Sequence, residues 1–131
     1  MAETDIQRVL HVLARHPELV LAMLFGSVAA GCARPESDLD LAVSAGRILT
    51  AGERLALMGE LAQATGRPVD LVDLETVGEP LLGQIVRKGI RLLGDDERHA
   101  RLLMKHLIEE ADFLPYRRRI LEERRKAWIA G

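Results

Sequence analysis

The sequence predicts an α/β (α+β) fold, a mixed sheet with helices packed on it, and two observations support this. Four short apolar runs have the length of β-strands, and the segments between them carry apolar residues every three or four positions, as amphipathic helices do. The runs are residues 19–25, 38–43, 68–74 and 90–93. A sheet of mixed direction with helices against it, in two layers, is the simplest arrangement for these elements.

Three helices are expected before residue 94. Thr4 or Asp5 can cap the first and Thr50 the second, and Pro80 can begin the third. Thr50 and Glu53 have the spacing of a capping box, in which each side chain accepts a hydrogen bond from the other residue's amide. Gly66 and Gly89 are placed to end the second and third helices. The apolar faces expected to pack inward are Ile6, Val9, Leu10 and Leu13; Leu55, Met58, Leu61 and Ala62; and Leu81, Leu82, Ile85 and Val86.

Composition restricts the class of protein. The 131 residues, 48% hydrophobic and 29% charged, fit one globular domain. A formal net charge of −2 argues against a general nucleic-acid binder. Cys32 is the only cysteine, which excludes an internal disulfide and fits a cytoplasmic protein. We expect no signal peptide, and no apolar run approaches the ~20 residues of a membrane span. The four histidines lack the spacing of a zinc site and are expected on the surface.

Asp38 and Asp40 form an Asp-x-Asp pair at the start of the second expected strand. Successive side chains of a strand point to opposite faces, so both carboxylates project the same way, roughly 6.5–7 Å apart. Leu39, Leu41 and Val43 point to the other face and give the strand a reason to be buried. Two such carboxylates suit Mg²⁺ shared with substrate phosphates, and a two-metal site holds both the attacking and the leaving oxygen. A lone Asp-x-Asp is more often simply solvated.

Gly26-Ser27 follows the first expected strand and precedes Asp38 by ten intervening residues. Gly26 lets the backbone approach a ligand closely, and the N–H groups of the turn, together with the Ser27 hydroxyl, form a natural phosphate cradle. Residues 28–30 begin a helical turn that Gly31 terminates. A lone Gly-Ser is most often only a turn, but its combination with the aspartate pair at this spacing favours nucleotide chemistry.

The pattern Gly26-Ser27, ten residues, Asp38-x-Asp40 resembles the signature of the polymerase-beta-type nucleotidyltransferase superfamily. The match covers most of residues 1–95 in element order, and the short chain is similar to the minimal nucleotidyltransferase (MNT) domains. The matching residues inside the motif also include Phe25, Arg34-Pro35 and Ser37. The resemblance implies a polymerase-beta-like fold. MNT domains are typically paired with a HEPN protein in prokaryotic toxin–antitoxin operons, so it also implies an antitoxin and a HEPN-type toxin partner.

A third carboxylate is expected in residues 68–74, which contain Asp70 and Asp73. These two differ in strand parity, so a regular strand aims only one of them at the site. We choose Asp70, because an unpaired carboxylate in mid-strand is costly without a cation or proton nearby. The resemblance agrees, since these nucleotidyltransferases commonly carry their third acidic residue on a strand beside the motif strand. Asp73 is better explained as a solvated strand end or a cap, and the reversed assignment is the alternative.

The reaction implied by the resemblance is Mg²⁺-dependent transfer of AMP from ATP to a tyrosine of a HEPN ribonuclease toxin, which inactivates the toxin. Asp70 would bind one of two expected Mg²⁺ ions and help deprotonate the acceptor hydroxyl. The expected site residues are Gly26, Ser27, Arg34 and Ser37 for the nucleotide and Asp38, Asp40 and Asp70 for catalysis and metal binding.

The chain departs from this family pattern in its phosphate turn. Many members have arginine directly after Gly-Ser and again two positions on, whereas this chain has Val28 and Ala30. Triphosphate affinity then depends on Arg34 or on a partner, although an exposed loop arginine is more often merely solvated. Two alternative functions follow: a weak or inactive antitoxin that binds and occludes its partner, and a small-molecule nucleotidyltransferase. The second is disfavoured because nothing beyond the core is long enough to form an acceptor domain.

Residues 95–131 are expected to form a C-terminal helical extension to a nucleotidyltransferase core of residues 1–94. Apolar residues recur there at helical spacing (Ala100, Leu103, Leu107, Ala111), and Leu114-Pro115 predicts a break between two helices. Residues 116–129 carry six basic and two acidic residues together with the chain's single Tyr and Trp. A tail of this kind is most often a solvated amphipathic helix. The sharper interpretation is a docking surface for a protein partner, ranked above nucleic acid because aromatic residues are too sparse for a stacking platform.

Overall fold

The computed structural model describes residues 3–130, except for the side chains of residues 113–118 and 126–130. The elements in chain order are α1 (Asp5–Leu13), β1 (Leu21–Phe25), α2 (Gly26–Ala30), β2 (Leu39–Ser44), α3 (Ala51–Thr65), β3 (Val69–Asp73), α4 (Leu81–Lys88), β4 (Ile90–Leu93) and α5 (Asp96–Ala130). The four expected strands are all present, as are the expected helices before residue 94. No helix among residues 3–130 is both long and apolar enough to cross a membrane.

The strands form one sheet in the order β3-β2-β1-β4. β1 runs antiparallel to both of its neighbours, β2 and β4, whereas β2 and β3 are parallel and are joined through α3. This crossover is the connection that a parallel pair requires. The mixed sheet predicted from the sequence is therefore confirmed.

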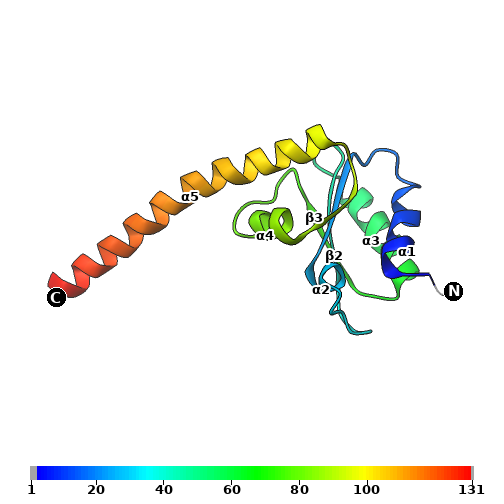
Figure 1. Ribbon diagram of the computed structural model, residues 1–131, viewed down its shortest axis with the longest axis horizontal. Coiled ribbons are helices and arrows are strands. Elements are labelled where there is room, and N and C mark those ends of the chain that lie inside the picture. The colour runs from blue at the N-terminus through cyan, green and yellow to red at the C-terminus, as the bar shows by residue number, and fades with distance from the viewer. Residues whose placement is uncertain (1–2, 131) are drawn as a thin grey trace.

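Helices cover both faces of the sheet, so the expected two-layer arrangement is wrong (Figure 1). α1 and α3 pack on one face around Leu24, Leu41 and Leu61, while α4 and the start of α5 pack on the other face around Met23 and Leu82. All five residues of β1 are apolar and buried. A strand that is apolar on both faces requires cover on both sides.

The helix ends follow local sequence signals, but the inward faces do so only in part. The capping boxes at Thr4 and Thr50 are formed, and Gly66 ends α3 in the left-handed conformation. Leu55, expected to be buried, is 71% exposed, and Leu57 takes its place with Leu61. The two-residue offset between Leu55 and Leu57 is a rotation of about 200° around a helix, so only one of them can face the sheet.

α5 is a single helix through Leu114-Pro115, so the predicted break and the second C-terminal helix are wrong. A proline inside a helix removes one hydrogen bond and crowds the preceding turn. It can therefore bend a helix without ending it. The later part of α5 extends away from the sheet (Figure 1). The side chains of Tyr116 and Trp128, on which the docking interpretation relies, lie outside the described residues.

Candidate active site

The sharp turn between β1 and α2 places Gly26 directly against Asp40. Gly26 has φ +73°, and a Cβ at this position would lie 2.1 Å from Asp40 Oδ2. The contact follows from strand register, because Phe25 is the partner of Asp40 in the β1–β2 pair. Only glycine can supply this conformation together with this close approach. The two halves of the sequence motif therefore meet, as the spacing led us to expect.

Asp38 and Asp70 lie close to Asp40. Asp40 and Asp70 are register partners in the parallel β2–β3 pair, and Asp38 is exposed just before β2 begins. The pKa of Asp40 is raised, first by partial burial and then by the negative charges of Asp70 and Asp38. A raised pKa of this origin reports carboxylates held near one another. The fold thus gathers the three aspartates selected from the sequence at one edge of the sheet.

Asp73 serves the loops around it and lies away from this cluster. Its register partner is Val43, three residues along β2 from Asp40. Its carboxylate accepts hydrogen bonds from the backbone N–H groups of Leu49 and Glu75, each at 2.9 Å. Asp73 is only 4% exposed, so the expectation of a solvated strand end is wrong, and the carboxylate instead binds two loop amides.

The carboxylate set fits a hard divalent cation by its chemistry. Oxygen ligands from Asp suit Mg²⁺, and a cation would relieve the repulsion that raises the pKa of Asp40. No three His, Cys, Asp or Glu side chains in the described part of the chain already have the arrangement of a metal site. Asp38 and Asp70 are both exposed, whereas Asp40 is half-buried, so a shared metal requires the side chains of the three aspartates to move closer together.

The loop between α2 and β2 is held by its own hydrogen bonds. The Arg34 N–H donates to Ser37 Oγ at 2.9 Å, and the Ser37 N–H donates to the Arg34 carbonyl at 3.0 Å. The Ser37 hydroxyl therefore shapes this loop. Arg34 is exposed.

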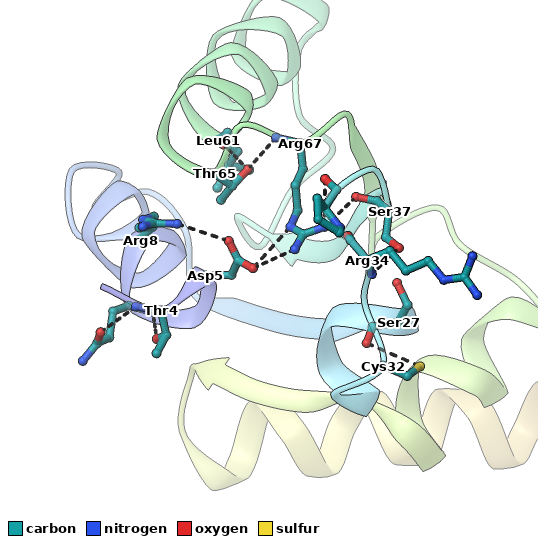
Figure 2. Close-up of polar contacts among 12 residues, drawn as sticks. Thr4, Asp5, Arg8, Ser27, Cys32, Arg34, Ser37, Leu61, Thr65 and Arg67 are labelled. Atoms are coloured by element: carbon teal, nitrogen blue, oxygen red, sulfur yellow. Dashed lines mark hydrogen bonds and ion pairs between the residues drawn. The ribbon is translucent and has the colours of Figure 1, made fainter. Parts of the chain in front are cut away.

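Arg67 holds the same loop from the other side, and no sequence pattern distinguishes it from a solvated arginine. Its guanidinium donates to the Arg34 carbonyl and, at 3.1 Å, to the Ser37 carbonyl. It also donates to the Asp5 carboxylate of α1, at 3.2 and 3.1 Å (Figure 2). The Arg67 side chain is 11% exposed. It therefore fixes the segment that leads into Asp38.

A cavity of about 610 Å³ opens beside the Gly26 turn. It is lined by Phe25, Gly26, Ser27, Ala30, Cys32, Asp40, Gln84 and Lys88. Two of these residues, Gln84 and Lys88, come from α4 and were missed in the sequence, because α4 shows only an ordinary amphipathic pattern. The cavity brings a glycine turn, a carboxylate and an ammonium group together, which is chemistry suited to a nucleotide phosphate bound with a metal.

Comparison with known proteins agrees with this geometry. The family model "Polymerase beta, Nucleotidyltransferase" matches residues 7–98, which include the turn, the three aspartates and α4. The chain belongs to this family. It is also 41% identical over 87 residues to the protein adenylyltransferase MntA of Shewanella oneidensis. That alignment covers 64% of this chain and 63% of MntA, so it spans slightly less than two thirds of the relative.

Solved structures extend the similarity beyond the family match. A toxin–antitoxin crystal structure with AMP-PNP contains a chain that is 30% identical, with a TM-score of 0.80, covering 90% of this chain and 96% of that one. A complex of the tri-AMPylated Shewanella oneidensis HEPN toxin with MNT antitoxin contains another, 28% identical with a TM-score of 0.74, covering 91% of this chain and 94% of that one. The polymerase-beta-like nucleotidyltransferase fold predicted from the sequence is confirmed.

Proposed function

We propose that this chain is a cytoplasmic, Mg²⁺-dependent antitoxin that transfers AMP from ATP to a tyrosine hydroxyl of a cognate HEPN ribonuclease toxin and so neutralises it. The observation that carries the proposal is the contact between the Gly26 turn and Asp40, with Asp70 beside Asp40 in register. The relatives support the acceptor class, since one is named a protein adenylyltransferase and another was solved with an AMPylated HEPN toxin.

In this mechanism the Gly26-Ser27 turn binds the β- and γ-phosphates, and Asp38 and Asp40 hold the metal. Bound Mg²⁺ supplies charge neutralisation for the triphosphate and for the leaving pyrophosphate. Asp70 accepts the proton of the acceptor hydroxyl, whose oxygen forms a bond to the α-phosphorus. The bond from the α-phosphorus to the bridging oxygen breaks, and pyrophosphate leaves with that electron pair. Positioning and charge provide most of the catalysis.

Arg34 and Ser37 have different roles in this proposal. Ser37 acts through loop shape, because its hydroxyl accepts the Arg34 N–H and its carbonyl accepts from Arg67. The Arg34 side chain is exposed and is available to the outer phosphates or to the incoming toxin. No residue of this chain is assigned to recognition of the acceptor tyrosine, which the toxin surface has to present.

A second function, occlusion without transfer, is favoured by one face of α5. Four large apolar residues within two turns of this helix are between 37% and 57% exposed: Leu103, Met104, Leu107 and Ile108. The buried side chains of α5 are instead Leu102 and His106, so the stripe at helical spacing through Leu103 and Leu107 faces away from the core. We propose residues 95–131 as a docking extension to the core of residues 1–94, which serves either transfer or occlusion.

A labelling experiment separates the two functions. The purified chain is incubated with α-labelled ATP and Mg²⁺, with and without the HEPN protein encoded by the adjacent gene. The test variant is Asp38→Asn/Asp40→Asn, and the matched control is Glu36→Gln, which removes an exposed carboxylate from the same loop.

The proposed function requires label on the toxin with wild type and Glu36→Gln, and none with the double variant. Label that persists in the double variant would refute the catalytic assignment. Loss of toxin ribonuclease activity without any label would establish occlusion instead.

A further inference from the structure

The phosphate turn of this chain has no basic residue of its own. Val28 and Ala30 provide no charge on α2, and Arg34 is not among the residues that line the cavity. A triphosphate carries several negative charges, and proteins usually meet them with Lys or Arg in addition to a metal. A cation inside the cavity therefore has to come from another element.

Lys88 is the one positively charged side chain among the residues that line this cavity in the described part of the chain. It lies opposite the Gly26 turn for a reason of register. Ile90 of β4 is the antiparallel partner of Leu24 in β1. Lys88 ends α4 two residues before Ile90, and Gly26 begins α2 two residues after Leu24, so this strand pair brings the end of α4 beside the start of the phosphate turn.

The last turn of α4 is fixed tightly enough to hold Lys88 in this position. A Cβ on Gly89 would lie 2.3 Å from the Ile85 carbonyl and 3.3 Å from the Leu24 carbonyl. The backbone after Lys88 therefore lies directly on β1, close to where β1 enters the phosphate turn. Gln84, one turn earlier on the same face of α4, also lines the cavity and adds an uncharged donor.

Lys88 could have an ordinary structural role in its helix, which has to be distinguished from a role in nucleotide binding. A basic residue in the last turn of a helix interacts favourably with the helix dipole, and Arg87 has the same place in α4. Arg87 points elsewhere, because its guanidinium lies 3.1 Å from where a Cβ on Gly83 would stand, and it does not line the cavity. The two neighbours thus share helix position and charge and differ in what they face.

We propose that Lys88 binds the β- and γ-phosphates of the nucleotide, in place of the cations that α2 lacks. This inference rests on the proposed nucleotidyl transfer and assigns its triphosphate subsite to α4. Lys88 then distinguishes a triphosphate from a monophosphate, because only the former extends past the α-phosphorus to reach the ammonium group.

Calorimetric titration tests the assignment with two probes, both in Mg²⁺. The first is α,β-methylene ATP, whose α–β bridge is not cleaved by transfer, and the second is AMP. Lys88→Ala is expected to weaken the triphosphate analogue about tenfold, the lower range for a hydrogen bond between charged groups, and to leave AMP unchanged. Arg87→Ala should leave both affinities unchanged, and Lys88→Arg should retain most of the triphosphate affinity.

Two results would overturn the assignment, since a role in helix stability predicts both. The first is an equal loss of triphosphate affinity in Lys88→Ala and Arg87→Ala, and the second is an equal loss of affinity for the two probes in Lys88→Ala. Failure of wild type to bind the triphosphate analogue would overturn this assignment and the proposed function together. If wild type binds the analogue, the Lys88 assignment and the proposed transfer can fail separately. Absence of AMP transfer with Lys88-dependent triphosphate affinity refutes transfer alone, and normal transfer with unchanged affinity in Lys88→Ala refutes this assignment alone.

Discussion

Gly26→Ala is the substitution that examines the geometry of the site most directly. The new Cβ would lie 2.1 Å from Asp40 Oδ2, 2.8 Å from its Cγ and 3.1 Å from its Cβ. Turning the Asp40 carboxylate away relieves the first two contacts, whereas the third remains. We therefore expect Asp40 to leave its position beside Asp70 and the turn to shift slightly.

The size of the effect follows from two contributions. A non-glycine residue at φ +73° costs about 1–2 kcal/mol. The tight contact with Asp40 adds roughly 1 kcal/mol, in the range of small overpacking effects. For a domain of this size about 1 kcal/mol corresponds to roughly 4 °C in Tm, so a fall of about 10 °C is expected. AMP transfer should fall about a hundredfold, because a carboxylate displaced by about 1 Å is no longer in reactive geometry.

Gly46→Ala provides the matched control. Gly46 has φ +74°, and no atom lies within 4 Å of a Cβ built there, so it carries the backbone strain without the contact. Its Tm should fall by about 5 °C and its transfer rate should stay near wild type. The assays are thermal unfolding by circular dichroism and label transfer at a temperature where both variants are folded. Equal transfer rates in the two variants would show that Gly26 is only a turn residue and that the contact with Asp40 has no catalytic meaning.

Three other perturbations test separate parts of the fold. Arg67→Ala should lower the free energy of unfolding in urea by about 1.5–3 kcal/mol and slow AMP transfer, whereas Arg47→Ala, which breaks an exposed pair with Glu53, should destabilise the fold less. Equal losses in the two variants would refute the role of Arg67 in holding the loop. Burial lowers the pKa of His16, but Glu60 and Glu18 raise it by more, so the net pKa lies above the ordinary value of a histidine. The stabilisation is therefore full below about pH 6.5 and is lost as the pH rises through the folded-state pKa, so His16→Gln should lower Tm more at pH 6 than at pH 9, and an equal effect at both would refute this sign. Leu107→Glu, at a position 57% exposed, should leave Tm and nucleotide affinity unchanged and weaken capture of the HEPN toxin in a pull-down, which an inert helix face would not do.

The strands and helix ends were predictable because their causes are local. Thr50 and Glu53 cap α3 through neighbouring amides, and Gly66 ends it by its own conformation. Strand parity also gave a correct local inference, since it separated Asp70 from Asp73 before either position was known. In the sheet Asp70 pairs with Asp40, whereas Asp73 pairs with Val43. The catalytic role of Asp70 itself stays a prediction.

His106 shows what could not be predicted. The histidines were expected on the surface, yet His106 is 5% exposed and its ring bonds the Glu79 carboxylate. A Cβ on Gly83 would lie 2.9 Å from both the His106 ring and Glu79, so a glycine on α4 admits the pair. Burial of this pair requires His106 of α5 to meet Glu79 and Gly83, which lie more than twenty residues away in sequence. Arg67 and Lys88 were missed for the same reason, because Arg67 bonds to, and Lys88 shares a cavity with, a segment at least thirty residues away in sequence.

The charge of the active site is imposed by backbone pairing. The β2–β3 register that sets Asp40 beside Asp70 also buries Leu39, Leu41 and Leu71, and each buried leucine contributes about 1.5–3 kcal/mol. The raised pKa of Asp40 means that its ionised form costs stability, a cost absent at low pH and present once the pH exceeds that pKa. Apolar burial offsets this repulsion, so the strands stay paired and the carboxylates stay together. A divalent cation is the chemical partner that such an arrangement of carboxylates favours.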